Sequence, residues 1–309
     1  MRIGQIDLDT SHAGAFAEIL SAGDKARIVA ILPGETVMTA ELTRDYAEKF
    51  GVEHVVETPE EMIGKVDLVL IQSVDWDVHL PRALPFLEAG IPVFLDKPLC
   101  GNLADCASFQ EWESRGALIY GSSSLRYTRE VDEYLALPTD QRGERFRVVY
   151  GAVGTDDFNY AIHVAEMLGG LLGRGFTSVR FLDESDSVQL YEARHDCGAV
   201  VVFQHSGVWL PFSLGVTTEK GFRHIAVDNS KLYATMLEKM LAAFENRGPL
   251  AGMADIAESV RLLLAAKLSR ESGGREVALD DAGLKDVSFD GKAFADSYGP
   301  TRRASLLNK

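Results

Sequence analysis

The residues best placed for chemistry follow a short apolar run, Val93-Phe-Leu95, which predicts a buried strand. The run ends on Asp96-Lys97-Pro98, and the proline, which has no N–H to donate to a neighbouring strand, turns the chain there. Ligands of open α/β sheets bind at the carboxyl ends of the strands. Lys97 is therefore predicted to project into a ligand crevice. Taken alone, the pattern is also that of a strand ending on a solvated lysine.

The turn after the first predicted strand, residues 2–9, is a second candidate site. Dinucleotide-binding domains carry G-x-G-x-x-G there, because the glycines let the backbone approach the pyrophosphate. This chain places Asp7, Asp9 and His12 at the three glycine positions. The carboxylates bring negative charge towards a phosphate, so we expect any dinucleotide to bind weakly. The alternative interpretation is a capped helix without a ligand. The cofactor candidates from this segment are Gly4, Asp7, Asp9, Thr10, Ser11 and His12.

The end of the second predicted strand lacks the acid that binds the ribose in many dinucleotide sites. Pro33 stands at that position, and Glu35, two residues later, is a weak substitute. Glu35 therefore joins the cofactor candidates.

Six alternating strand and helix units over residues 1–121 predict a doubly wound parallel sheet. Four or so strand-like runs then follow without intervening helices, which favours a mostly antiparallel sheet. The predicted fold is α/β, with an N-terminal Rossmann-type domain (1–121) and a C-terminal α+β domain (122–309) on an open sheet. The last 25 residues are polar and predict a tail that wraps the surface. The predicted strands are 2–9, 27–32, 54–57, 66–73, 92–96, 117–121, 145–153, 176–182, 187–194, 198–206 and 222–228. The predicted helices are 13–22, 37–50, 78–89, 102–115, 160–172, 231–246 and 254–271.

The composition of the chain limits the kinds of molecule that it is expected to bind. The chain has 309 residues, a net charge of −15 and 46% hydrophobic residues, which argues against nucleic acid or an anionic membrane as partner. Three cysteines without metal-like spacing suit a reducing cytoplasm, and no metal site is predicted. Apolar residues alternate along the strands between 176 and 228, and few helices remain to cover both faces of their sheet. We therefore expect a homodimer or a larger homo-oligomer.

With these features the chain resembles the Gfo/Idh/MocA oxidoreductases. Asp96-Lys97-Pro98 matches the family's Glu-Lys-Pro at the end of strand five, and His79 matches a histidine in the preceding loop. Asn159-Tyr-Ala-Ile-His163 keeps the histidine of the family's Asp-x-Gly-x-His motif, and Ser123-Ser-Leu-Arg-Tyr127 looks like the entry to its second domain. More narrowly, Leu8-Asp-Thr-Ser-His12 is similar to an uncharacterised branch of these proteins.

The resemblance implies hydride transfer between NAD or NADP and a secondary alcohol or ketone of a sugar- or polyol-like small molecule. His163 would be the general base, since its ordinary pKa lies near neutrality. Lys97 would orient the oxygen and stabilise developing alkoxide charge, and its nearby charge is expected to lower the pKa of His163. The resemblance adds Ser73, His79, Asp96 and Lys97 as cofactor candidates, and Arg126, Asn159 and Tyr160 as substrate candidates.

Two alternatives from other classes stay open. One is a redox-neutral enzyme (a lyase, isomerase or hydrolase) that uses Lys97 and His163 without net cofactor turnover. The other is a non-catalytic binding or regulatory protein that keeps the fold and has lost the cofactor. The altered glycine turn favours both alternatives, whereas the Lys-His pair favours an enzyme.

Overall fold

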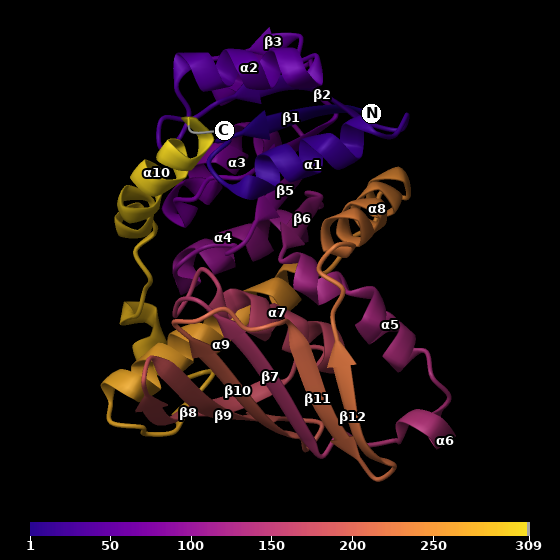
Figure 1. Ribbon diagram of the computed structural model, residues 1–309, viewed down its shortest axis with the longest axis vertical. Helices are drawn as coiled ribbons and strands as arrows, with labels where there is room; N and C mark the ends of the chain where they lie inside the picture. Colours follow the sequence, from indigo (N-terminus) through magenta and orange to yellow (C-terminus); the bar gives the residue numbers. More distant parts are fainter. Residues whose placement is uncertain (308–309) are drawn as a thin grey trace.

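The first half of the chain forms one parallel sheet, as predicted. The computed structural model describes residues 1–307, and its first sheet has the order β3-β2-β1-β4-β5-β6 (Figure 1). Strands β4 and β5 are buried along their whole length, as is typical of parallel strands covered on both faces; β4 is apolar throughout, and β5 is apolar up to Asp96. The strands are β1 (Arg2–Ile6), β2 (Arg27–Leu32), β3 (His54–Val55), β4 (Leu68–Ile71), β5 (Val93–Asp96) and β6 (Ile119–Ser122).

Side-chain caps set where the helices between these strands begin. The hydroxyl of Thr10 caps α1, that of Thr39 caps α2, and the amide of Asn102 caps α4. The segment after Thr58 forms a single 3₁₀ turn, Pro59–Met62. The helices of this part are α1 (Ser11–Ser21), α2 (Ala40–Phe50), α3 (His79–Glu88) and α4 (Leu103–Ser114).

The second half forms a mostly antiparallel sheet of order β12-β11-β7-β10-β9-β8-β13. Among the described residues of this second sheet, β7 and β10 are the one parallel pair. This confirms the predicted fold class. Sequence analysis missed two strands of this sheet: β13, which has only two residues, and β11. Gly215 interrupts the short apolar pattern of β11, and Phe222 of the next strand packs over that glycine. The strands are β7 (Val148–Gly154), β8 (Phe176–Ser185), β9 (Val188–His195), β10 (Val200–Ser206), β11 (Ser213–Thr218), β12 (Gly221–Ala226) and β13 (Val277–Ala278).

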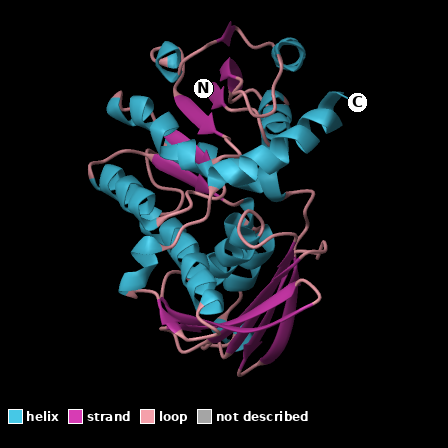
Figure 2. Ribbon diagram, turned by 90° about the vertical axis from the view of Figure 1, so that its left-hand side faces the viewer, coloured by secondary structure: helices cyan, strands magenta, loops and turns pink. Residues whose placement is uncertain are grey.

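Helices cover one face of the second sheet and tie it to the first (Figure 2). α7 packs on β7 and β10, α9 packs on β8, and α8 packs against α1. No described helix is both long enough and apolar enough to cross a membrane. The remaining helices are α5 (Arg129–Leu135), α6 (Thr139–Arg142), α7 (Ala161–Leu172), α8 (Leu232–Glu245) and α9 (Met253–Glu271).

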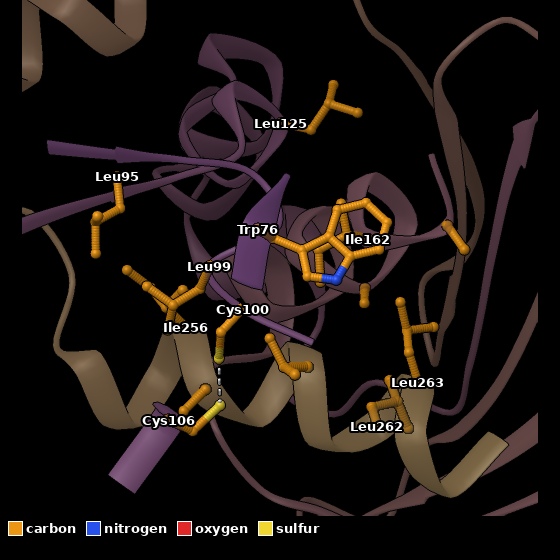
Figure 3. Packing of buried hydrophobic residues seen from close by; sticks show 14 of the residues in the cluster. Trp76, Leu95, Leu99, Cys100, Cys106, Leu125, Ile162, Ile256, Leu262 and Leu263 are labelled. Atoms are coloured by element: carbon orange, nitrogen blue, oxygen red, sulfur yellow. Dashed lines mark hydrogen bonds between the residues drawn. The ribbon is translucent and has the colours of Figure 1, made fainter. Parts of the chain in front are cut away.

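A continuous apolar core joins the two sheets (Figure 3). Trp76 and Leu99 come from loops that follow strands of the first sheet, whereas Ile162 lies on α7 and Ile256 on α9. All four side chains are almost fully buried. The two parts are therefore packed as one body, and the division at residue 121 stays a prediction about the chain's organisation.

The predicted surface-wrapping tail contains a helix that sequence analysis did not predict. Residues Gly291–Leu307 form a helix, α10, which returns to the N-terminal sheet (Figure 1, yellow). Its buried residues Gly291, Ala295 and Gly299 recur every four positions, so they form one stripe of small residues on one face. Residues 308–309 of the predicted tail lie outside the described residues.

The uncovered face of the second sheet carries apolar side chains. Val148 and Tyr150 on β7 and Phe222 on β12 are 41%, 37% and 70% exposed. We expect this face to join two or more copies of the chain. Phe222→Lys should weaken self-association at least tenfold, whereas Val55→Lys, which changes an exposed residue of the first sheet, should not. Light scattering at micromolar concentration measures both, and a monomeric wild type would refute the prediction.

Candidate active site between the two sheets

Lys97 reaches from the end of β5 across to the C-terminal part. Its Nζ donates to the main-chain O of Asn159 (3.1 Å) and to its Oδ1 (2.7 Å), and lies 5.5 Å from the centre of the Tyr160 ring. Burial lowers the pKa of Lys97, although the charges of Asp96 and Asp156 oppose this shift. Lys97 is thus a fixed hydrogen-bond donor that gives up a proton more readily than a free lysine.

His163 lies in the first turn of α7. Its Nδ1 is 2.7 Å from Ser123 Oγ, and its ring meets the edges of Tyr160 and Phe212. Burial, followed by the nearby charges of Lys97 and His12, lowers the pKa of His163 well below its ordinary value. His163 is therefore neutral near pH 7, and Nε2 is the nitrogen left for a substrate.

His12, in the first turn of α1, forms a pair with Asp96, the residue before Lys97. His12 Nδ1 is 2.6 Å from Asp96 Oδ2, and Asp96 Oδ1 accepts a hydrogen bond from the Lys97 main-chain N–H (2.8 Å). Burial alone would raise the pKa of Asp96, but the nearby His12 and Lys97 hold it below the usual range. The sequence places His12 at a glycine position and gives no sign of this pairing, because Asp96 lies 84 positions away.

Aromatic rings surround these polar groups. Trp209 is 52% exposed in the loop after β10, and its ring makes T-shaped contacts with those of Phe212 and Tyr160, with ring centres 5.2 and 6.4 Å away. On the other side, the Tyr233 ring of α8 lies 5.1 Å from that of His12. Sequence analysis missed Ser123, Trp209, Phe212 and Tyr233 as members of this site; only Ser123 stood in a segment that it quoted.

A large crevice of about 890 Å³ opens at the carboxyl ends of β1, β2 and β4. The first turn, the loop after β2 and the loop after β4 form three of its walls, and α10 forms the fourth. It is lined by Asp7, Asp9, Leu32, Pro33, Gly34, Glu35, Thr36, Val56, Glu57, Ser73, Asp75, Val78, Arg82, Lys292, Ala295, Asp296, Gly299 and Pro300.

Asp7 keeps the backbone shape of the glycine that it replaces. Its φ of 55° is in the left-handed region, which aspartate tolerates better than most side chains. Its carboxylate accepts hydrogen bonds from Ser73 Oγ (2.6 Å) and from Arg82 Nε and Nη2 (3.1 and 3.3 Å). Arg82 therefore compensates the charge that sequence analysis expected to repel a phosphate.

The negative charge of Asp9 is reduced in a different way, by a raised pKa. Burial, and then the neighbouring Asp7, raise the pKa of Asp9 to about 7. Its Oδ2 accepts a weak hydrogen bond from Val74 N (3.4 Å), whereas within residues 1–307 its buried Oδ1 has no hydrogen-bond partner. Near neutral pH, part of the population therefore presents a protonated carboxyl group to the crevice.

Comparison with known proteins identifies a family for the N-terminal part of the chain. Residues 9–121 match the Gfo/Idh/MocA family model, described as an oxidoreductase family with an NAD-binding Rossmann fold. Residues 9–121 belong to the Gfo/Idh/MocA oxidoreductases. Over 113 residues the chain is 29% identical to inositol 2-dehydrogenase of Gluconacetobacter diazotrophicus. That match spans 36% of this chain and 32% of the relative, so it covers about a third of the relative's length.

Solved structures share the fold over nearly the whole chain. A probable dehydrogenase from Thermotoga maritima has a TM-score of 0.78 at 21% identity, covering 91% of this chain and 99% of that one. A myo-inositol dehydrogenase from Lactobacillus casei, in complex with NAD(H) and myo-inositol, has a TM-score of 0.78 at 16% identity, covering 92% and 98%. Likeness at this level of identity establishes the fold alone.

The crevice of the Gfo/Idh/MocA region fits a dinucleotide. Its volume lies in the range of about 300–1,000 Å³ that is usual for ligand pockets. The first turn keeps its left-handed residue at Asp7, and Arg82 supplies a cation beside it. Asp9 also lines the crevice, and its raised pKa makes it less negative than an ordinary carboxylate. Exposed Glu35 lines the crevice near the expected ribose position.

Three predicted site residues need correction. Gly4 lies inside β1, where a Cβ would come 2.9 Å from Met62 Sδ, so its role is packing. His79 is fully buried, with its ring nitrogens 3.0 Å from the main-chain oxygens of Leu99 and Ser73, so it cannot touch a cofactor directly. The Arg126 guanidinium pairs with buried Glu166, so we leave Arg126 out of the proposed substrate contacts.

The other predicted residues lie in the crevice or in the candidate site around Lys97. Thr10 Oγ1 accepts from His12 N and lies 3.5 Å from Asp96 Oδ2, and Ser11 is exposed at the start of α1. Asn159 and Tyr160 contact Lys97, as described above. Within residues 1–307, no group of three or more His, Cys, Asp or Glu side chains is arranged to hold a metal ion.

Proposed function

We propose that this protein is an NAD-dependent dehydrogenase that acts on a secondary alcohol of a small polyol or sugar. The observation that carries the proposal is that Lys97 and a neutral His163 lie against the same Tyr160 ring, at the end of β5 in a region that matches the Gfo/Idh/MocA family model. A general base and a fixed cation are the two groups that alcohol oxidation needs around one oxygen.

In this proposal, Lys97 and His163 have separate roles at the substrate oxygen. Lys97, held by Asn159, binds the substrate oxygen and stabilises its negative charge as the proton leaves. His163 takes that proton at Nε2, while Ser123 Oγ, which accepts from Leu125 N, lies 2.7 Å from Nδ1 and accepts a hydrogen bond from its proton in the tautomer that leaves Nε2 as the base. When bound, a nicotinamide cofactor accepts the hydride that leaves the alcohol carbon. The buried surroundings keep water from competing for the same donors.

Two features support the choice of substrate and cofactor. The aromatic side chains of Tyr160, Trp209 and Tyr233 beside fixed polar groups suit a ring with apolar faces and hydroxyl edges, and two of the similar proteins are named as inositol dehydrogenases. Glu35 and Glu57 line the crevice, and their negative charge favours the ribose hydroxyls of NAD over the extra phosphate of NADP. We place the protein in the cytoplasm because its three cysteines are free.

One observation favours a second candidate function. The His12–Asp96 pair adds another imidazole beside Lys97, which suits a redox-neutral enzyme that moves two protons. The two functions differ in the fate of the cofactor: a dehydrogenase accumulates NADH, whereas a redox-neutral enzyme converts substrate with no net change in absorbance at 340 nm.

The direct test incubates the purified protein with NAD or NADP and a panel of inositols and hexoses. We expect NADH formation with at least one polyol and a clear preference for NAD. Product formation without NADH would favour the redox-neutral candidate. Absence of dinucleotide binding at millimolar concentration, measured by calorimetry, would reject the dehydrogenase.

The pKa of Asp9, about 7, makes NAD binding dependent on pH. Below pH 7 the carboxyl group is protonated and does not repel the diphosphate; above pH 7 it is ionised and does. The repulsion is on the order of 1 kcal/mol, so Kd should rise about fivefold between pH 6 and pH 8. Calorimetry should find this rise in the wild type and little of it in Asp9→Asn. An equal rise in both proteins would refute the role of Asp9.

A further inference from the structure

We propose that α10 is part of the nucleotide-binding site: it forms the wall that contacts the adenosine end of a dinucleotide, and its attachment to the loop after β2 slows the ligand's release. The inference rests on the proposed function for the class of ligand, a diphosphate that carries adenosine.

The first turn of α10 is fixed to the loop after β4. The main-chain N–H groups of Gly291 and Lys292 donate to Asp77 Oδ2 (2.8 and 3.3 Å). A Cβ at Gly291 would come 2.6 Å from Asp75 Oδ1 and 2.8 Å from Trp76 N, so only glycine allows this approach.

The last turns of α10 are fixed to the loop after β2. Arg303 donates to three main-chain oxygens, those of Glu35, Thr36 and Val37, each at 3.0 Å. A Cβ at Gly299 would come 2.8 Å from Thr36 O, so the helix again touches the loop through a glycine.

These two attachments place α10 across the crevice. Strands β2 and β4 flank β1 in the sheet, so a helix fixed to the loops after both of them spans the turn after β1 (Figure 1). A dinucleotide binds at that turn in Rossmann folds. A ligand in the crevice would therefore lie between the sheet and α10.

The face that α10 turns to the crevice leaves room for a ligand. A helix that served only as a brace would fill the space with large apolar side chains, as cores do. Here Ala295, Gly299 and Pro300 line the crevice, and about 890 Å³ stays open. The attachment at Arg303 consists of hydrogen bonds at a partly exposed position, which can be broken and remade.

The helix also brings charge to the site. Of the residues that line the crevice, Arg82 and Lys292 carry positive charge, among several carboxylates. Arg82 is already bound to Asp7. Lys292 pairs with Asp296 at 2.6 Å. Because the Lys292 side chain is 69% exposed, it can leave this surface ion pair and turn towards a phosphate.

The test uses ADP-ribose, which has the adenosine and diphosphate groups and no nicotinamide. Lys292→Glu should raise the Kd of ADP-ribose about tenfold, whereas Lys285→Glu, the same reversal at an exposed position outside the crevice, should leave it unchanged.

Arg303→Ala should speed ADP-ribose dissociation about tenfold in stopped-flow measurements, with Arg174→Ala as the exposed control. In the wild type, hydrogen exchange at residues 34–38 and along α10 should slow when ADP-ribose binds.

The inference is overturned if Arg303→Ala speeds hydrogen exchange in α10 while the affinity and dissociation rate of ADP-ribose stay as in the wild type, because α10 would then be only a brace. It is also overturned if the wild type binds no ADP-ribose. Tight, α10-dependent binding without oxidation of any polyol would support the inference and count against the proposed function. Normal polyol oxidation with α10-independent binding would do the reverse.

Discussion

Lys97→Ala should lower kcat by about two to three orders of magnitude while NAD binds nearly as in the wild type. The ammonium of Lys97 is held by Asn159, and its contribution grows as the substrate oxygen becomes an alkoxide. The loss therefore falls on the transition state more than on the ground state, and KM should change less than kcat. Initial rates with the best polyol of the panel measure the effect.

Lys231→Ala, which changes an exposed lysine before α8, is the matched control and should keep full activity. Thermal unfolding followed by circular dichroism shows whether Lys97→Ala remains folded. A folded Lys97→Ala protein with less than a tenfold loss in kcat would show that this lysine does not stabilise the reacting oxygen.

His163→Ala should cost about two to four orders of magnitude in kcat/KM, because it removes the general base. The pKa of His163 is lowered, so the wild-type base stays unprotonated as the pH falls through the range in which a free histidine takes up a proton. The wild-type kcat/KM should therefore hardly fall between pH 7.5 and pH 6. Below the lowered pKa it should fall tenfold per pH unit.

Ser123→Ala tests the orientation of the same ring. It removes the partner of Nδ1 but leaves the base in place, so it should cost less than His163→Ala. If His163→Ala kept the wild-type rate and pH profile, His163 would have a structural role inside α7 and another group would take the proton.

The fold was largely predictable because its signals are local. Strands such as β4 are apolar throughout, since both faces are buried, and the caps of α1 and α4 are visible as residue types. β11 was missed because Gly215 breaks the alternation that marks a strand. α10 was missed because its contact stripe is glycine and alanine, which carries little hydrophobic signal.

The candidate site was only partly predictable, because its electrostatics arise from residues far apart in the chain. From the sequence, Asp7 is expected to repel a phosphate. In the structure, Arg82, 75 positions away, donates a hydrogen bond to its carboxylate and compensates the charge. Asp9 reads as an ordinary carboxylate, yet burial raises its pKa to about 7. Lys97 and His163, in contrast, stand in short motifs, and for that reason the sequence could indicate them.

The central claim is that Lys97 and His163 act in one site, and the pKa of His163 in solution tests it most directly. The chain has seven histidines, so the resonance of His163 is assigned by its loss in His163→Gln and is then followed against pH by NMR. We predict a pKa well below 6.5 in the wild type, and a clear rise in Lys97→Met, which keeps the bulk of the side chain and removes its charge. A wild-type pKa near 6.5 that does not change in Lys97→Met would contradict the claim.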